Sequence, residues 1–206
     1  MKLYYAPGAC SLGIHVLLEE IGEPYETVKL DLRGGETQRP PYTDINPKGK
    51  VPLLVRDDGR HVTEYPVIAH YLAESYPEAS LLPDDEEAKL RAAEVTDYCV
   101  ATIHMQGFSR VFRPSAFAPS ESDHPAVKAF GRQIMEKGFG IVERGMAGQD
   151  WVAGKYSYAD SALFYVAYWA TKHVGITLPP ACAAQFDHML ARPAVQRMMA
   201  AEGLTA

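Results

Sequence analysis

The order of apolar and polar positions changes character partway along this 206-residue chain. Through residue 76, short apolar or alternating runs typical of strands are separated by stretches of helical spacing and by turn residues. The pattern predicts, in order, a strand over 2–5, a helix over 14–21, a strand over 25–30, a weak helix over 38–45, strands over 51–55 and 60–63, and a helix opened by Pro66. Asp57-Asp58-Gly59 between the last two strands is a hairpin signal. The order, βαβ then ββα, predicts a small α/β domain with a mixed sheet.

Beyond a linker over residues 77–85, strand patterns vanish and helical periodicity dominates. Helices are predicted near 86–113, 124–147, 157–174, 182–191 and 193–201, with prolines between them. The chain is therefore expected to form an α/β domain over 1–76 and an all-helical domain over 86–206. No stretch approaches the roughly 20 apolar residues of a membrane span, and no signal peptide is recognisable. A cytoplasmic protein without a membrane partner is expected.

Composition narrows the choice of partners. Hydrophobic residues make up 47% of the chain and charged residues 22%, which is enough apolar material for a core, and the net charge is -6. An acidic surface repels phosphate backbones, so nucleic acid is not expected as a partner. The three cysteines include no C-x-x-C pair, and the seven histidines stand at no ligand spacing. Neither a disulfide framework nor a metal site is therefore expected.

Cys10 is the first candidate for chemistry. It follows the first predicted strand and stands at the start of the first helix, where unpaired N–H groups and the helix dipole favour a thiolate on the protein or on a ligand. Burial as a small apolar residue is the alternative. Cys99 and Cys182 lie in or beside apolar helical patterns and are expected in the core. Because Gly13 stands where a C-x-x-C would place its second cysteine, single-thiol chemistry is favoured.

Two further places offer backbone groups or charge to a ligand. Val51 precedes a proline that cannot donate to a sheet, and it keeps an N–H and a C=O able to pair with an extended peptide. The bond between Val51 and Pro52 can be cis or trans. Pro66 suits a first helical position, and neither Glu64 nor Tyr65 is a strong cap, so this helix start can receive a carboxylate and Glu64 an ammonium. Glu64 stabilising its own helix N-terminus is the alternative.

Taken together, these segments resemble the cytosolic glutathione transferases, in particular the bacterial beta-like group. The resemblance extends over essentially the whole chain, in the same order and spacing, at residues 2–12, 46–54, 57–59, 63–64, 68–72, 151–154, 157–160 and 192–195. It implies a thioredoxin-like domain that binds glutathione as co-substrate, a helical domain that helps to hold a small apolar electrophile, and a homodimer. The implied function is conjugation of glutathione to the electrophile, in detoxification.

The resemblance also assigns roles to residues. Cys10 is implied to be the cysteine of the catalytic position, Val51 to pair with the cysteinyl backbone of glutathione, and Glu64 to hold the γ-glutamyl end with Tyr65. The full set implied to bind glutathione is Tyr5, Ser11, Arg33, Lys50, Val51, Pro52, Glu64 and Tyr65. No metal is implied.

The chain departs from the beta-like pattern in its polar residues. Met105-Gln106 stands where the group carries a His-Lys pair, and His104 is one residue early, about 100° around an α-helix. Tyr98 replaces an Asn, Tyr65 replaces a small residue, and Arg33 is the available substitute for a lysine after the second strand. Polar contacts to glutathione are therefore expected to be fewer or different.

Five residues of the first long helix recur at helical spacing: Tyr98, Thr102, Met105, Ser109 and Phe112. They are expected either to line a less polar electrophile pocket or to pack within the core. Two alternatives to conjugation stay open. One is glutathione-dependent thiol–disulfide exchange through a mixed disulfide at Cys10. The other is a non-catalytic ligand-binding scaffold on the same fold, which the missing His-Lys pair favours.

Overall fold

The computed structural model of the protein describes residues 1–146 and 148–205. The chain divides into two compact units, one formed by Met1–Leu82 together with the segment that begins at Leu190, and one formed by Pro83–Met189. The predicted domains differ from these units in the last helix, which the sequence pattern groups with the helical domain. Residues 147 and 206, where a predicted helix and the predicted second domain end, lie outside the described residues.

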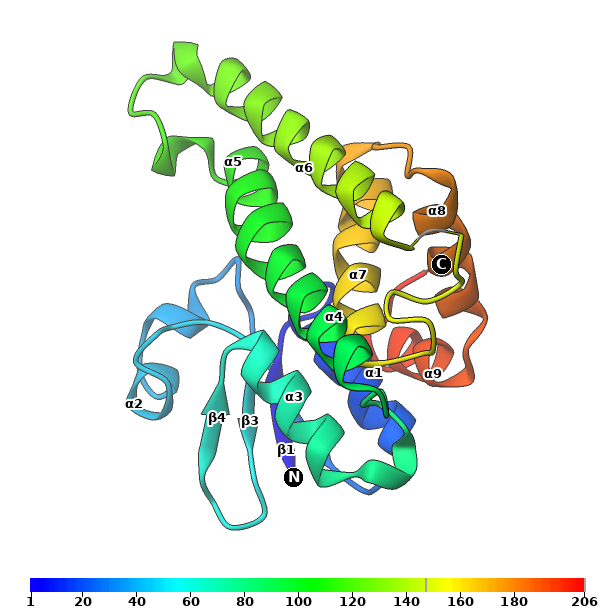
Figure 1. Ribbon diagram of the computed structural model, residues 1–206. Coiled ribbons are helices and arrows are strands. Elements are labelled where there is room, and N and C mark those ends of the chain that lie inside the picture. The colour runs from blue at the N-terminus through cyan, green and yellow to red at the C-terminus, as the bar shows by residue number, and fades with distance from the viewer. Residues whose placement is uncertain (147, 206) are drawn as a thin grey trace. The chain divides into compact units, whose positions relative to one another are not determined.

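The first unit is built on a four-stranded sheet with the order β2-β1-β3-β4 (Figure 1). Its strands are β1 (Lys2–Tyr5), β2 (Glu26–Lys29), β3 (Leu53–Val55) and β4 (His61–Thr63). β1 runs parallel to β2 and antiparallel to β3, and β3 runs antiparallel to β4. The parallel pair needs a crossover, which the first helix supplies. The mixed sheet and its helices confirm the predicted α/β fold.

Helical elements follow the strands of this unit along the chain. They are α1 (Ser11–Ile21), η1 (Glu36–Gln38), α2 (Tyr42–Ile45), α3 (Tyr65–Ser75), η2 (Pro77–Ala79) and, from the end of the chain, α9 (Pro193–Glu202). α1 ends at Gly22, whose φ of 77° is the left-handed conformation that glycine adopts without steric cost. The weak helix predicted over 38–45 is split, because Pro40 and Pro41 interrupt it. α1 packs on β1, α3 and α9.

The second unit is helical, as predicted. Its elements are α4 (Glu86–Asp97), η3 (Tyr98–Phe108), α5 (Ser109–Phe112), η4 (Pro114–Ala116), η5 (Glu121–Asp123), α6 (His124–Met146), α7 (Tyr158–Trp169), η6 (Ala170–Val174) and most of α8 (Pro180–Ala191). The helix predicted over 86–113 is continuous, but its middle, η3, is a π-helix with i→i+5 hydrogen bonds. Residues three or four apart in η3 therefore do not stack as they would in an α-helix.

α7 is the buried centre of the helical unit, and all of its residues are buried. Ser157 and Asp160 form a capping box at its start, as the S-x-x-D spacing predicts. The Asp160 carboxylate accepts hydrogen bonds from the amides of Ser157, at 2.9 Å, and Val152, at 3.1 Å. Burial raises the pKa of Asp160 to about 7, against the opposing effect of these donors. Asp160 therefore ties the preceding loop to the helix start.

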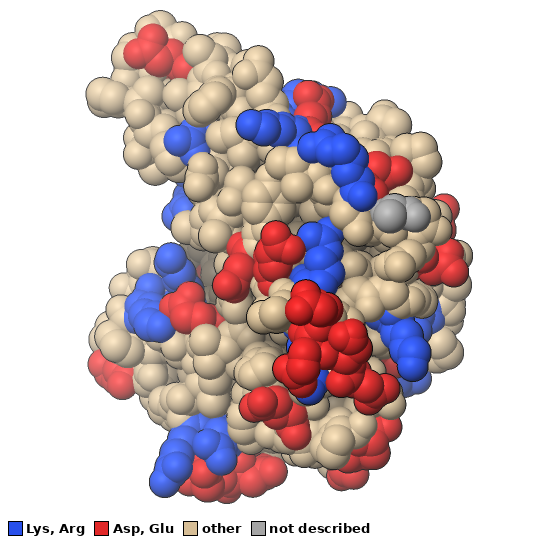
Figure 2. Space-filling model, viewed as in Figure 1, with Lys and Arg blue, Asp and Glu red and all other residues tan. Residues whose placement is uncertain are grey.

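One group of charged side chains on the surface, at the start of α4, is explained by local structure. Figure 2 shows acidic side chains gathered over α4, whose start carries the acidic run 84–87. Asp85 caps this helix by accepting a hydrogen bond from the Glu87 amide at 2.9 Å. Negative charge at a helix N-terminus is stabilising, so this run supports α4. Among the described residues, no helix combines the length and apolar character needed to cross a membrane.

α6 crosses the segment η3–α5 at two glycines. A methyl group on Gly131 would stand 2.7 Å from the carbonyl oxygen of Gly107 and 2.8 Å from the Cβ of Arg110. Both distances are shorter than van der Waals contact, and one of the atoms belongs to the backbone. The two helices can approach this closely only because position 131 lacks a side chain.

We expect Gly131→Ala to lower the free energy of unfolding by about 1–3 kcal/mol, because the added carbon forces the helices apart. Gly140→Ala is the matched control in the same helix, since its methyl group would meet only an Arg144 guanidinium nitrogen at 3.8 Å. The control should raise the free energy of unfolding by up to about 1 kcal/mol through helix propensity. Thermal unfolding followed by circular dichroism measures both, and a stabilised Gly131→Ala would contradict the close crossing.

Candidate functional site

Cys10 immediately precedes the first turn of α1. The loop over residues 6–10 that carries it is held by its own hydrogen bonds. The Ser11 hydroxyl accepts from the Ala6 N–H at 3.2 Å and donates to the Ala6 C=O at 3.3 Å, and the Ala9 N–H donates to the same carbonyl at 3.0 Å. Gly8 has a φ of 69°, which favours glycine. Ser11, a predicted glutathione ligand, is fully buried and fixes this loop.

The Cys10 thiol is directed at Val51. Its Sγ donates a hydrogen bond to the Val51 carbonyl at 3.3 Å. Burial raises the pKa of the Cys10 thiol to about 12, although the amides of Cys10 and Ser11 at the helix start, and then the charge of Lys50, favour the thiolate. The sequence pattern identifies the helix-start effect but not the larger cost of desolvating the thiolate. Cys10 is therefore a protonated hydrogen-bond donor at neutral pH.

Val51 presents its backbone next to this thiol. It stands just before β3, and its peptide bond to Pro52 is cis. Within the described residues, the Val51 N–H has no hydrogen-bond acceptor, and its C=O accepts from the Cys10 thiol. A buried amide normally has a partner. The N–H and C=O of Val51 are thus suited to pairing with the backbone of an extended peptide.

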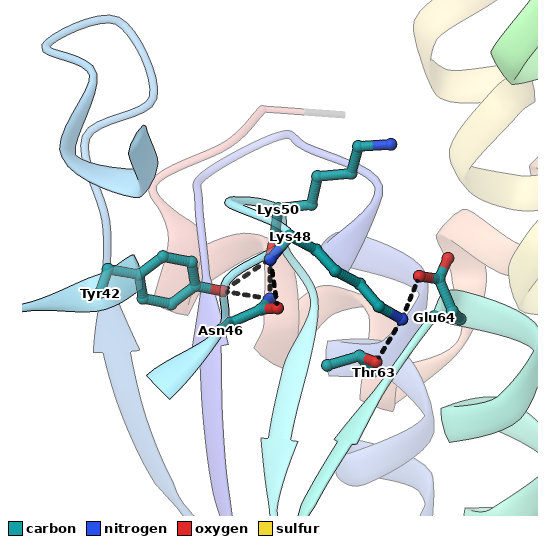
Figure 3. Close-up of polar contacts among 6 residues, drawn as sticks. All are labelled: Tyr42, Asn46, Lys48, Lys50, Thr63 and Glu64. Carbon is teal, nitrogen blue, oxygen red and sulfur yellow. Dashed lines mark hydrogen bonds and ion pairs between the residues drawn. The ribbon is translucent and has the colours of Figure 1, made fainter. Parts of the chain in front are cut away.

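A polar cluster fixes the direction in which the chain enters Val51 (Figure 3). The carbonyl of Lys50 accepts from the Tyr42 hydroxyl at 2.6 Å and from the Asn46 side-chain amide at 2.7 Å. Tyr42 and Asn46 are both buried, so the anchor is rigid. Figure 3 shows the Lys50 side chain pointing away from this cluster. Sequence reasoning missed Tyr42 and Asn46 as supports, although the Asn46-Pro47-Lys48-Gly49 turn signal marks the place.

Glu64 lies at the start of α3 in an uncommon backbone conformation, with φ 70° and ψ 127°. Such conformations cost about 1–3 kcal/mol and cluster at functional sites. Lys48 Nζ donates to Glu64 Oε1 at 2.6 Å and to Thr63 Oγ1 at 2.8 Å (Figure 3). The side chains of Lys48 and Glu64 are both about half exposed, so a ligand ammonium can reach the carboxylate in place of Lys48. Among the described residues, no side chain caps α3.

The other predicted glutathione ligands have different surroundings. Tyr5 and Tyr65 are buried, and the Tyr5 ring packs against His15 with ring centroids 5.4 Å apart. Pro52 is buried as well. Arg33 lies in an exposed turn, and no hydrogen bond or ion pair among the described residues links it to Cys10 or to the cluster of Figure 3. The structure therefore brings Cys10, Lys50 and Val51 together, joins Glu64 to Lys48, and leaves Arg33 apart from these contacts.

The five predicted pocket residues of the helical unit do not share one environment. Ser109 is buried, whereas Met105 is 37% exposed and Phe112 is 46% exposed. The Tyr98 hydroxyl lies near α6, 3.8 Å from where a side chain on Gly138 would begin, and Thr102 is partly exposed. Tyr98, Thr102 and Met105 lie in the π-helix η3, whereas Ser109 and Phe112 lie in α5, so their shared role as pocket residues stays a prediction.

His104 belongs to an aromatic cluster that the sequence reasoning missed. Its ring packs edge-on against Trp169, at 4.7 Å between centroids, and against Tyr165, whose hydroxyl lies 3.4 Å from His104 Nδ1. Phe108 and Phe112 stack on each other and also contact Trp169. The i, i+4 spacing of Tyr165 and Trp169 could have indicated this cluster, because residues four apart lie side by side on a helix. The 100° step applied to His104 assumes an α-helix and does not hold in η3.

Comparison with known proteins gives a consistent result. Residues 8–75 match the family model described as "Glutathione S-transferase, N-terminal domain". The chain is 36% identical to glutathione S-transferase GstA of Escherichia coli O157:H7 and 33% identical to glutathione S-transferase GST-4.5 of Xanthomonas campestris pv. campestris, in each case over 99% of this chain and 100% of the relative. Both matches extend through the helical unit as well as the sheet-containing one.

Two solved structures with bound glutathione are also similar. A glutathione transferase homolog from Sulfitobacter has a TM-score of 0.89 and 29% identity, with 99% of this chain and 98% of that chain covered. A sphingomonad glutathione S-transferase complexed with glutathione has a TM-score of 0.85 and 32% identity, with 100% of each chain covered. The similarity therefore concerns the fold of the whole chain.

The raised pKa of the Cys10 thiol predicts how its rate of alkylation depends on pH. Only a thiolate is alkylated rapidly, so the rate with iodoacetamide should be low near pH 7 and rise roughly tenfold per pH unit up to about pH 11. Cys10→Ser supplies the background from the buried Cys99 and Cys182. A rate that levels off near the ordinary thiol pKa of about 8.5 would contradict the effect of burial.

Proposed function

The chain belongs to the cytosolic glutathione S-transferase family, in its bacterial beta-like group, and from this premise we propose that it conjugates glutathione to small apolar electrophiles. The observation that carries the proposal is the Val51 backbone, whose N–H lacks an acceptor among the described residues, beside the Cys10 thiol. A cytoplasmic homodimer that acts in detoxification is part of the same proposal.

Glutathione has groups that match those of the first unit. Its cysteinyl unit is an extended backbone that pairs with the N–H and C=O of Val51, which directs the ligand thiol toward the start of α1. Its γ-glutamyl ammonium binds Glu64 in place of Lys48. Its γ-glutamyl carboxylate faces the start of α3, where no side chain of the described residues caps the helix and the dipole favours negative charge.

The nucleophile is the glutathione thiolate, and Cys10 assists it. Burial keeps Cys10 protonated, so its S–H is a hydrogen-bond donor. Without ligand the S–H donates to the Val51 carbonyl, but bound glutathione pairs with that carbonyl and the S–H is then available to another acceptor. The S–H then donates to the glutathione thiolate, together with the amides at the start of α1. Each unit by which these donors lower the glutathione thiol pKa corresponds to about 1.4 kcal/mol. The thiolate forms a carbon–sulfur bond with the electrophile as the leaving group departs with its electron pair.

The helical unit supplies apolar contacts for the electrophile in this proposal. Met105 and Phe112 have the exposure that a contact surface needs, and Phe112 is backed by the ring of Phe108. The hydroxyls of Tyr98 and Thr102 add polar groups, while the buried Ser109 supports the helix. A surface of this kind favours substrates that are mostly apolar.

Thiol–disulfide exchange at Cys10 is the second candidate, because Cys10 is the cysteine with surface exposure and Cys99 and Cys182 are buried. In that reaction the Cys10 thiolate attacks a mixed disulfide between glutathione and a substrate thiol, and the substrate leaves as a thiolate. A second glutathione thiolate then attacks the Cys10–glutathione disulfide, which releases glutathione disulfide and regenerates the Cys10 thiolate. The attack requires a thiolate that the raised pKa of Cys10 makes scarce at neutral pH. Exchange is therefore ranked below conjugation.

Calorimetric titration with reduced glutathione, followed by conjugation to an aryl halide, tests the proposal. We expect the wild type to bind glutathione and Cys10→Ala to keep its affinity, because Val51 and Glu64 hold the ligand. The Cys10→Ala variant should lose roughly tenfold in kcat/KM below neutral pH and show a pH profile shifted up by about one unit, because the thiolate loses a donor.

Cys10→Ser separates the two reactions. Serine keeps a hydrogen-bond donor but forms no disulfide, so conjugation should survive and exchange should vanish. Absence of glutathione binding by the wild type would instead favour a non-catalytic scaffold. Turnover of a disulfide substrate without any conjugation of aryl halides, epoxides or enones would favour exchange.

A further inference from the structure

Lys48 pairs with the carboxylate that the proposed function assigns to the ammonium of glutathione. Lys48 Nζ lies 2.6 Å from Glu64 Oε1, while Glu64 Oε2 accepts no hydrogen bond from the described residues. The side chain of a lysine and the amino group of a γ-glutamyl unit both end in –NH3⁺, a compact charge with three N–H donors. Lys48 therefore offers Glu64 the same chemistry as the ligand does.

The turn over residues 46–49 holds Lys48 close to Glu64. The Lys48 N–H donates to Asn46 Oδ1 at 3.2 Å, and the buried Asn46 is itself fixed by donating to the Lys50 carbonyl at 2.7 Å. From this turn the Lys48 side chain extends to the end of β4, where Nζ also donates to Thr63 Oγ1 at 2.8 Å (Figure 3). A fixed backbone and a second acceptor both favour the paired position of the ammonium.

The pair is exposed enough to be exchanged for a ligand. The side chains of Lys48 and Glu64 are 49% and 54% exposed. Measured strengths of ion pairs this exposed correspond to a closed form favoured over the open one by roughly 1.5- to 5-fold. A ligand that needs the open form binds more weakly in proportion to the fraction that is open. Closure of the Lys48 pair therefore weakens binding of an ammonium at Glu64 by about two- to sixfold.

We propose that Lys48 is a specificity-determining residue that competes with the ammonium of glutathione for Glu64. The inference rests on the proposed function, in which glutathione binds Val51 and Glu64 together. A ligand with an ammonium must displace Lys48, whereas a peptide whose amino group is absent leaves Lys48 in place and Glu64 paired. Lys48 thus sets how strongly the site prefers glutathione to a peptide of the same shape without the ammonium.

One variant and one matched control isolate this competition. Lys48→Met keeps an unbranched side chain and removes the charge. Lys2→Met removes the same charge and breaks an exposed pair of the same kind, Lys2 Nζ to Glu26 Oε2 at 2.9 Å, at the end of β1 away from Cys10. Titration in about 0.3 M salt, where the Debye length is about 6 Å, limits the effect of net charge on the anionic ligands.

Calorimetric titration with two ligands gives the readout. They are reduced glutathione and glutaryl-cysteinylglycine, which is glutathione without its amino group. In Lys48→Met we expect the Kd of glutathione to fall about two- to sixfold and the Kd of the glutaryl peptide not to fall, because only glutathione has to displace Lys48. Lys2→Met should stay within about 1.5-fold of wild type with both ligands.

Conjugation kinetics separate competition from a structural role of Lys48. Competition acts equally on the ground state and the transition state, so the KM for glutathione in Lys48→Met should fall by the same factor as Kd while kcat stays within about 1.5-fold. In a Glu64→Gln background, Lys48→Met should have no effect on the Kd of glutathione, because the carboxylate for which the two cations compete is gone.

An unchanged or raised Kd of glutathione in Lys48→Met would overturn the inference and leave the proposed function standing. Equal tightening of both ligands, the same shift in Lys2→Met, or a shift that persists without the Glu64 carboxylate would overturn it too. Each of these results would assign the effect to something other than Glu64. If neither the wild type nor Lys48→Met binds glutathione, the proposed function fails and the inference fails with it.

Discussion

The antiparallel pairing of β1 with β3 is the contact on which the candidate site depends. In this pairing Tyr4, near the end of β1, lies opposite Leu53, at the start of β3. The segment that leaves β1 and the segment that enters β3 therefore lie side by side at the same end of these two inner strands. The first carries Cys10 and the second carries Val51, and the hydrogen bond between them spans 41 residues of sequence. Strand pairing brings the two segments together, and their exact positions are then fixed by the hydrogen bonds of Ser11, Tyr42, Asn46 and Glu202.

The order of strands and helices could be predicted because their signals are local. Alternation, helical spacing and the Asp57-Asp58-Gly59 turn each act over a few residues, and the structure has those elements in that order. The ends were less predictable. β3 begins at Leu53 and not at Val51, since Pro52 has no N–H to give to the sheet. The π-helix η3 was not predicted, because a spacing of apolar residues does not reveal whether hydrogen bonds close at i+4 or i+5.

The chemistry of the site was harder to predict than its location. A helix start next to a cysteine suggests a thiolate, and the amides of Cys10 and Ser11 do act in that direction. Their effect is outweighed by burial, which is produced by residues distant in the sequence and leaves no local pattern. The pairing of Lys48 with Glu64 and that of Glu202 with Gly8 are long-range in the same way. In the proposed mechanism a protonated Cys10 acts as a hydrogen-bond donor to the glutathione thiolate and not as the nucleophile.

The composition of the first unit has a consequence for how the chain folds as it is made. The helical unit is one continuous stretch, whereas the sheet-containing unit recruits the segment that begins at Leu190. Domains usually fold in order of emergence during synthesis, at about 5–20 residues per second. Here the first unit is completed only after α9 has been synthesised, because α1 packs on α9 and the Gly8 N–H donates to Glu202 of α9. The ribosome therefore releases a chain whose helical middle can fold before its beginning is finished.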